Sequence, residues 1–131
     1  MTRHEAREQA FTVLFEELFQ PADSLEELAT RAEDSGFIKL NGFSRDLLAL
    51  VDTNRAAIDA LIDEHCRDWS RDRLPRVSLA VLRLAIAEIR YGNEIPAGVA
   101  VNEAVELAKT FGTPEDASYI NGVLGTIVRG A

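Results

Sequence analysis

Hydrophobic residues recur along the whole chain at intervals of three and four, and no stretch shows the strict alternation typical of a strand. The first helical pattern covers residues 4–19 and is ended by Pro21. Ser24 followed by Glu27 has the spacing of a capping box. A second helix is therefore expected to start there and to stop before Gly36.

The middle of the chain predicts two longer helices joined by a polar connector. Residues 43–66 keep helical spacing on both sides of a polar DTNR stretch. The connector DWSRDRLPR is expected to hold at most one short turn, around Trp69. A fourth helix is predicted over residues 78–91, with Gly92 closing it.

Two further helices complete the pattern. Pro96 suits the first turn of the fifth helix, which should end at Gly112. Between Val99 and Lys109 this helix has four polar residues, which are Asn102, Glu103, Glu106 and Lys109. Because its polar stripe is so narrow, we expect it to be the most enclosed helix of a bundle. Thr113 should cap the last helix, with Asp116 reaching back to it.

Composition agrees with an all-α, single-domain bundle of about six to seven helices over residues 1–131. Hydrophobic residues make up 47% and charged residues 27%, as in ordinary globular proteins. No apolar run is long enough to cross a membrane. The opening MTRHEAREQAF carries charges where a signal peptide would be apolar, so we expect a cytoplasmic protein.

The search for catalytic or metal-binding chemistry gives little. Cys66 is the single cysteine, and its side chain and that of His65 diverge on a helix, so no metal site is expected. There is no glycine loop for phosphates and no spacing that forces a catalytic set to converge. We therefore expect no enzymatic activity and no cofactor.

Charge leaves one feature unexplained. The net charge of −8 is unfavourable for loose nucleic-acid binding, although a local basic patch remains compatible with it. Arg3 and Arg7 share one face of the first helix, near the positive end of its dipole, which favours binding of an anion. The alternative is that Glu5 and Glu8 neutralise them as exposed ion pairs.

Several short motifs, in this order and spacing, resemble the family of the bacterial transcription antitermination factor NusB. The resemblance covers essentially the whole chain, although residues 20–75 match only in helical pattern. The motifs are the opening Arg3 to Glu8, LR at 82–83, E-I at 88–89, IP at 95–96, NEAVELAK at 102–109 and NGVL at 121–124.

The resemblance implies a non-enzymatic factor that binds single-stranded boxA RNA together with the ribosomal protein that acts as NusE. The pair helps RNA polymerase, within an antitermination complex, to pass terminators while ribosomal RNA is made. The RNA contacts carried over from the family are Arg3, His4, Arg7, Asp116, Ser118 and Tyr119; the NusE contacts carried over are Phe15 and Ser78.

Three positions qualify these assignments. Tyr119 could stack on an unpaired base or pack on its own helix face, and both interpretations stay open. Glu5 reverses the charge of a segment that is often more basic in the family, so RNA affinity alone should be weak. Ser78 stands where the family is frequently acidic.

The resemblance also bears on Asn121 and Gly122, two poor helix formers inside the last helix. Glycine costs about 1 kcal/mol in a helix, so Gly122 is expected to admit a close neighbour where helices cross. Asn121 is expected to bridge backbone groups at that crossing.

Two other functions are compatible with a helical bundle of this kind. The RNA-targeting domain of an RNA cytosine methyltransferase has a similar fold, but a chain that ends at Ala131 leaves no room for its catalytic domain. A protein-binding helical adapter with little RNA affinity is the stronger alternative.

Overall fold

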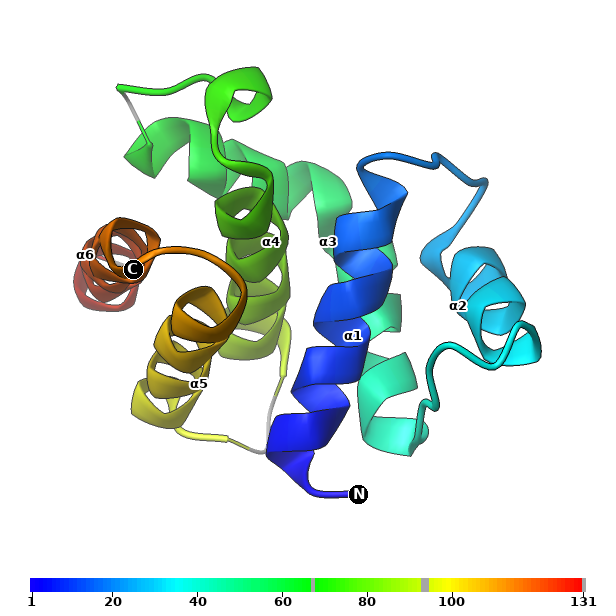
Figure 1. The fold of residues 1–131 in the computed structure, drawn as a ribbon. Helices are drawn as coiled ribbons and strands as arrows, with labels where there is room; N and C mark the ends of the chain where they lie inside the picture. The colour runs from blue at the N-terminus through cyan, green and yellow to red at the C-terminus, as the bar shows by residue number, and fades with distance from the viewer. Residues whose placement is uncertain (67, 93–94, 131) are drawn as a thin grey trace.

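The computed structural model describes residues 1–66, 68–92 and 95–130, and these form six α-helices and one short 3-10 helix without a strand (Figure 1). None of these helices is long and apolar enough to span a membrane. The all-α prediction is therefore confirmed. The elements are α1 (Arg3–Glu17), α2 (Leu25–Asp34), α3 (Gly42–His65), η1 (Arg71–Arg73), α4 (Arg76–Tyr91), α5 (Ala97–Phe111) and α6 (Pro114–Gly130).

Polar side chains fix the helix starts that the sequence predicted. Ser24 Oγ accepts a hydrogen bond from the Glu27 amide at 3.0 Å, which caps α2. At α6, Thr113 Oγ1 accepts from the Asp116 amide at 3.1 Å, and Asp116 Oδ2 accepts from the Thr113 amide at 3.0 Å. Pro114 is the first residue of α6, so this cap is confirmed in both directions.

The long helix α3 bends in its centre, which the sequence did not predict. Asn54 has non-helical dihedral angles, with φ −114° and ψ 19°. Its side-chain amide donates a hydrogen bond to the Leu50 carbonyl at 2.9 Å. In a regular helix this carbonyl would accept from a backbone amide one turn later. The DTNR stretch therefore marks a kink.

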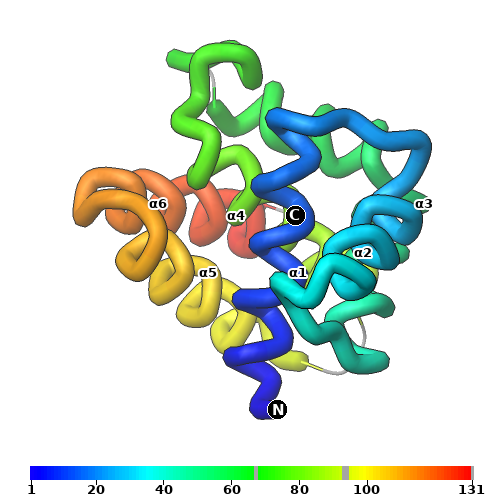
Figure 2. Tube along the Cα trace, turned by 45° about the vertical axis from the view of Figure 1, so that its right-hand side comes forward, coloured from blue at the N-terminus to red at the C-terminus, as the bar shows by residue number. Residues whose placement is uncertain are grey.

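Helix α4 lies at the centre of the bundle, between α5 and α6 on one side and α1 and α3 on the other, with α2 outermost (Figures 1 and 2). It buries Ser78, Leu79, Ala80, Val81, Leu82, Leu84, Ala85, Ile86, Ala87 and Glu88. The prediction that the fifth helix is the most enclosed is wrong. Helix α5 packs against α4 and α6 but leaves Val99 42% exposed and Val105 half-buried.

The explanation offered for Gly122 is also wrong. A Cβ atom there would meet no atom within 4 Å, and both Gly122 and Asn121 are exposed. Close approach occurs instead at Gly112, between α5 and α6. A Cβ there would lie 2.5 Å from Asp116 Oδ2 and 3.0 Å from the Ala108 carbonyl oxygen.

An ionic cluster holds the connector between α3 and α4. The expected turn is η1, just after Trp69, while Arg67 lies outside the described residues. Asp59 on α3 accepts hydrogen bonds from Arg83 of α4 at 3.0 and 3.2 Å and from Arg71 of η1 at 2.8 Å. Both neighbouring elements are thereby tied to the second half of α3.

Candidate nucleic-acid interface

The start of α1 is set by a capping box. Thr2 Oγ1 accepts from the Glu5 amide at 3.1 Å, and Glu5 Oε1 accepts from the Thr2 amide at 3.1 Å. Hydrogen bonds from the backbone and from the side chain of Thr2 to the Glu5 carboxyl lower the pKa of that carboxyl. Glu5 therefore serves the helix end, rather than pairing with Arg3 or Arg7 as one interpretation of the sequence supposed.

Arg7 requires a correction, because it is buried, with an exposed fraction of 3%. Its Nε donates to Glu88 Oε1 at 2.9 Å and its Nη2 to Glu88 Oε2 at 2.6 Å, while Nη1 lies 3.8 Å from Glu103 Oε1. Its guanidinium carbon also lies 5.1 Å from the centroid of the Phe43 ring. Arg7 is thus an internal ion that joins α1 to α4, and it cannot reach a phosphate in this arrangement.

Burial and pairing act in opposite directions on the Arg7 charge. Burial lowers the pKa of the guanidinium, but the hydrogen bonds to Glu88 and the charges of Glu88 and Glu103 raise the pKa overall. The pair is bidentate, which is the strong geometry for arginine and carboxylate.

The accessible cations at this end are Arg3 and His4. Arg3 is exposed, with its guanidinium carbon 4.6 Å from the centroid of the Phe43 ring. His4 is half-buried, with Nδ1 2.7 Å from Glu103 Oε2 and Nε2 3.7 Å from Glu8 Oε2. The hydrogen bond to Glu103 raises the pKa of His4. The start of α1 therefore presents a smaller positive surface than the sequence predicted.

The predicted residues of α6 take three different positions. Asp116 is engaged in the α6 cap, and Ser118 is exposed. Tyr119 is half-buried against the core. Burial and a hydrogen bond to Cys66 raise the pKa of Tyr119, so its hydroxyl points to the end of α3. The hydroxyl end of Tyr119 is therefore packed within the fold, as one of the two interpretations of the sequence supposed.

The two groups of predicted residues lie apart. Helix α5 starts beside the beginning of α1 and ends at the turn into α6 (Figure 1). Its 15 residues correspond to about 22 Å at 1.5 Å per residue. A depression between α5 and α6 runs part of this way and is lined by Asn102, Val105, Glu106, Lys109, Pro114, Ala117, Ser118 and Asn121.

Sequence reasoning missed this depression as a candidate site. Asn102, Glu106 and Lys109 follow one another at spacings of four and three, so they form one polar stripe of α5. That stripe was interpreted only as the narrow exposed face of an enclosed helix. It is the signal that could have identified the depression.

The residues assigned to a protein partner also separate. Ser78 is 1% exposed, with its Oγ 3.5 Å from Asp116 Oδ1, so its assignment to an interface is corrected. Phe15 is half-buried in a row of phenylalanines. Its ring centroid is 5.7 Å from that of Phe11 and 5.1 Å from that of Phe19, and Phe11 stacks on Phe111 at 4.8 Å.

This aromatic row, formed by Phe11, Phe15, Phe19 and Phe111, reaches from the buried core to the surface. Phe19 is 60% exposed and Phe111 is 42% exposed. The spacing of four between residues 11, 15 and 19 could have identified it, since these positions share a helix face. Phe111 joins the row only through the fold.

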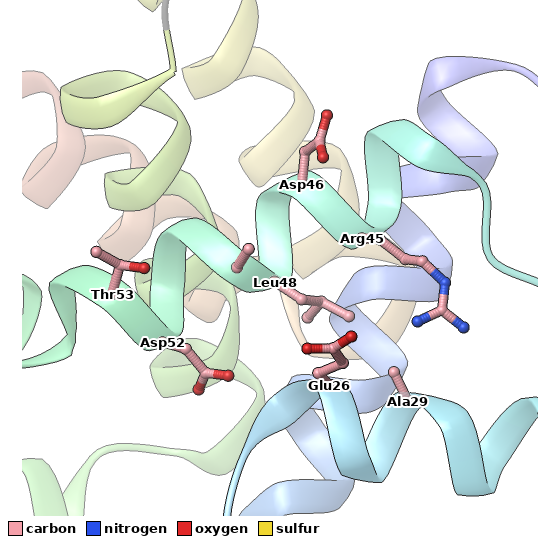
Figure 3. A pocket seen from close by; sticks show the side chains of 8 residues that line it. Glu26, Ala29, Arg45, Asp46, Leu48, Asp52 and Thr53 are labelled. Carbon is pink, nitrogen blue, oxygen red and sulfur yellow. The ribbon is translucent and has the colours of Figure 1, made fainter.

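A hollow of about 370 Å³ lies between α2 and α3 (Figure 3). Its carboxylates come from Glu26, Asp46 and Asp52, and its one cation, Arg45, pairs with Glu33. Such a surface repels phosphate, and no predicted site residue lines it. Within the described part of the chain, no group of three His, Cys, Asp or Glu residues could hold a metal ion.

Comparisons with known proteins agree on one family. The NusB family model matches residues 4–129. The transcription antitermination protein NusB of Oceanobacillus iheyensis is 39% identical over 128 residues, which cover 98% of this chain and 99% of that protein. The NusB protein of Pelotomaculum thermopropionicum is 42% identical over 132 residues, covering 98% and 90%.

Solved structures give the same result. A crystal structure of antitermination factors NusB and NusE in complex with dsRNA contains a chain with a TM-score of 0.86 and 26% identity, covering 98% of this chain and 97% of that chain. T. maritima NusB also has a TM-score of 0.86, with 31% identity and coverage of 98% and 92%.

Proposed function

Because the chain belongs to the NusB family, we propose that it is a cytoplasmic transcription antitermination factor that binds single-stranded boxA RNA together with the ribosomal protein acting as NusE. In this role it promotes processive transcription of ribosomal RNA as a non-enzymatic part of an RNA polymerase antitermination complex. The observation that carries the proposal is the match over nearly the whole chain to NusB proteins, one of which is solved with NusE and RNA.

The RNA surface in this proposal runs from the start of α1 along α5 to the start of α6. Arg3 and His4 supply positive charge near the positive end of the α1 dipole, where an anion is favoured. Ser118 and the exposed part of Tyr119 supply polar and aromatic contacts at the other end. Arg7 and Asp116 contribute through structure, because their charged groups are engaged within the fold.

The aromatic row is the proposed contact for the ribosomal protein. Aromatic side chains are enriched in protein interfaces, and buried aromatic anchors carry much of their binding energy. Phe15 lies within this row, and Phe19 and Phe111 extend its exposed area. Ser78 is buried beside Asp116 and contributes no exposed surface to this contact.

A protein-binding adapter with little RNA affinity remains a second candidate, favoured by two observations. The chain has a net charge of −8, and the charge of Arg7 is paired with that of Glu88 inside the fold. Because Arg3 and His4 are the accessible basic side chains at the start of α1, this surface should bind RNA weakly unless the partner supplies additional contacts.

A salt-dependent titration separates the two candidates. Labelled boxA RNA is titrated with the protein, with and without the ribosomal protein, at several salt concentrations and against a scrambled RNA. The antitermination proposal expects boxA-specific binding that strengthens with the partner. Partner binding without preference for boxA would identify the adapter, and binding of neither would refute both.

Two matched pairs of variants refine this titration. Arg3→Ala should lower the salt slope by about one unit through loss of one phosphate contact, whereas Arg31→Ala, whose side chain is 57% exposed on α2, should not. Phe19→Asp should weaken binding of the ribosomal protein, whereas Phe37→Asp, at a residue 88% exposed in a different loop, should leave it unchanged.

A further inference from the structure

His4 is surrounded by carboxylates from two helices. Glu103 of α5 lies 2.7 Å from Nδ1, and Glu8, one turn along α1, lies 3.7 Å from Nε2. Arg7 lies beside it as a cation, also faces Glu103 at 3.8 Å and is held by Glu88 of α4. This arrangement favours a positive charge on the imidazole.

The two ring nitrogens of His4 have different roles. Nδ1 is within hydrogen-bond distance of Glu103, so it carries a proton that it donates to this carboxylate. Nε2 lies beyond hydrogen-bond distance of Glu8. When the ring is neutral, Nε2 presents a lone pair and repels phosphate; when the ring is cationic, Nε2–H is a donor to phosphate.

We propose that Glu103 is a positioning residue for RNA binding, which orients His4 through Nδ1 and favours the cationic form of its ring, so that Nε2–H can bind a phosphate. This inference rests on the proposed function, because it assigns a regulator to the same RNA surface. It also means that α5 contributes to the RNA surface at the start of α1. The same helix lines the depression that leads to Ser118.

The charges around His4 give the direction of the pH dependence. The hydrogen bond to Glu103 and the charges of Glu103 and Glu8 outweigh burial and Arg7, and they raise the pKa of His4 above its ordinary value of 6.5. Affinity for RNA should therefore fall as the pH rises through the raised pKa of His4, by up to about tenfold per pH unit.

The decisive variant is Glu103→Gln, because the amide oxygen can still accept the Nδ1 proton while the charge is lost. The His4 ring is titrated by NMR in the free protein, and the affinity for labelled boxA RNA, with the ribosomal protein present, is measured from pH 5.5 to 8.5. Glu26→Gln on α2 is the control, since it removes the same charge at an exposed residue of a different helix that lines the α2–α3 hollow.

We expect Glu103→Gln to lower the His4 midpoint and to move the loss of RNA affinity to lower pH by the same interval, while Glu26→Gln behaves as wild type. Adding His4→Lys to Glu103→Gln should abolish the pH dependence in this range and restore affinity at neutral pH. Unchanged His4 midpoints, or coincident affinity profiles in proteins that bind RNA, would overturn the proposal. If no protein binds RNA at any pH, the proposed function fails as well, while the NMR midpoints still test the coupling between Glu103 and His4.

Discussion

Replacing Arg7 by methionine should destabilise the protein far more than the same replacement of a surface arginine. The side chains of Arg7 and Glu88 are 4% and 5% exposed, and two hydrogen bonds of 2.9 and 2.6 Å join them. Removing one partner of a buried ion pair leaves the other charge buried and costs about 3–5 kcal/mol. A domain of this size has about 5–15 kcal/mol in total, so Arg7→Met should retain little stability.

The double variant Arg7→Met/Glu88→Met tests the cause of this loss. It buries no charge at this position, so it should recover most of the stability that the single variant loses. Urea unfolding followed by circular dichroism gives the free energy of unfolding of each variant. Together with Glu88→Met, the wild type, Arg7→Met and the double variant form a double-mutant cycle. Arg31→Met is the control, because its pair with Glu27 is 3.6 Å long and exposed, and it should cost less than about 1 kcal/mol.

Two results would refute this reasoning. One is an Arg7→Met variant within about 1 kcal/mol of wild type, which would mean that the guanidinium and Glu88 are solvated in solution. The other is a double variant no more stable than Arg7→Met, which would assign the loss to packing against Phe43 rather than to the stranded charge.

Three further predictions concern packing, helix propensity and pH. Leu107→Asp should unfold the protein, because Leu107 is 1% exposed and the charge would be buried without a partner, whereas Val105→Asp should stay helical by circular dichroism because Val105 is half-buried beside solvent. Gly122→Ala should stabilise the protein by roughly 0.5–1 kcal/mol in urea unfolding, and Gly112→Ala should destabilise it because its Cβ would lie 2.5 Å from a carboxylate oxygen. The raised pKa of His4 means that its contribution to stability is fully present below about pH 6.5 and is lost as pH rises through the folded-state pKa. The unfolding free energy of wild type relative to His4→Gln should therefore decrease from pH 6 to pH 9.

Each of these has a contrary result. An unfolded Val105→Asp variant would show that α5 is covered on its outer side in solution. If Gly122→Ala destabilised the protein, another group would have to lie close to Gly122 in solution, as the sequence first suggested. A stability difference for His4→Gln that is constant with pH would show that Glu103 does not perturb the titration of His4.

Local patterns predicted the helices because the forces that set them are local. The Thr113–Asp116 cap and the end of α5 at Gly112 depend on residues within one turn. The degree of burial of α5 could not be predicted in this way, since it depends on which neighbours cover a helix. An apolar composition shows what can be buried, while α4 is enclosed because four helices pack against it.

The site was predicted less well because its contacts join distant parts of the chain. Arg7 and Glu88 are 81 residues apart, so no local spacing pairs them. A local signal existed for Arg7 alone. Arg7 shares an apolar helix face with Phe11 and Leu14, which is an unusual place for a charge without a buried partner.

The Arg7–Glu88 pair also has a consequence for the order in which the chain folds. Helices α3, α4, α5 and α6 pack mainly on their neighbours in sequence, so they can assemble through local contacts, which form fastest. Helix α1 is synthesised before them, yet Arg7 cannot meet Glu88 until the chain has grown past that residue. We expect the amides of α1 to gain protection from hydrogen exchange after those of α4 during refolding. We expect the charge of Arg7 to keep α1 in contact with water until that pair forms. Once formed, the pair with Glu88 fixes the position of α1 along α4.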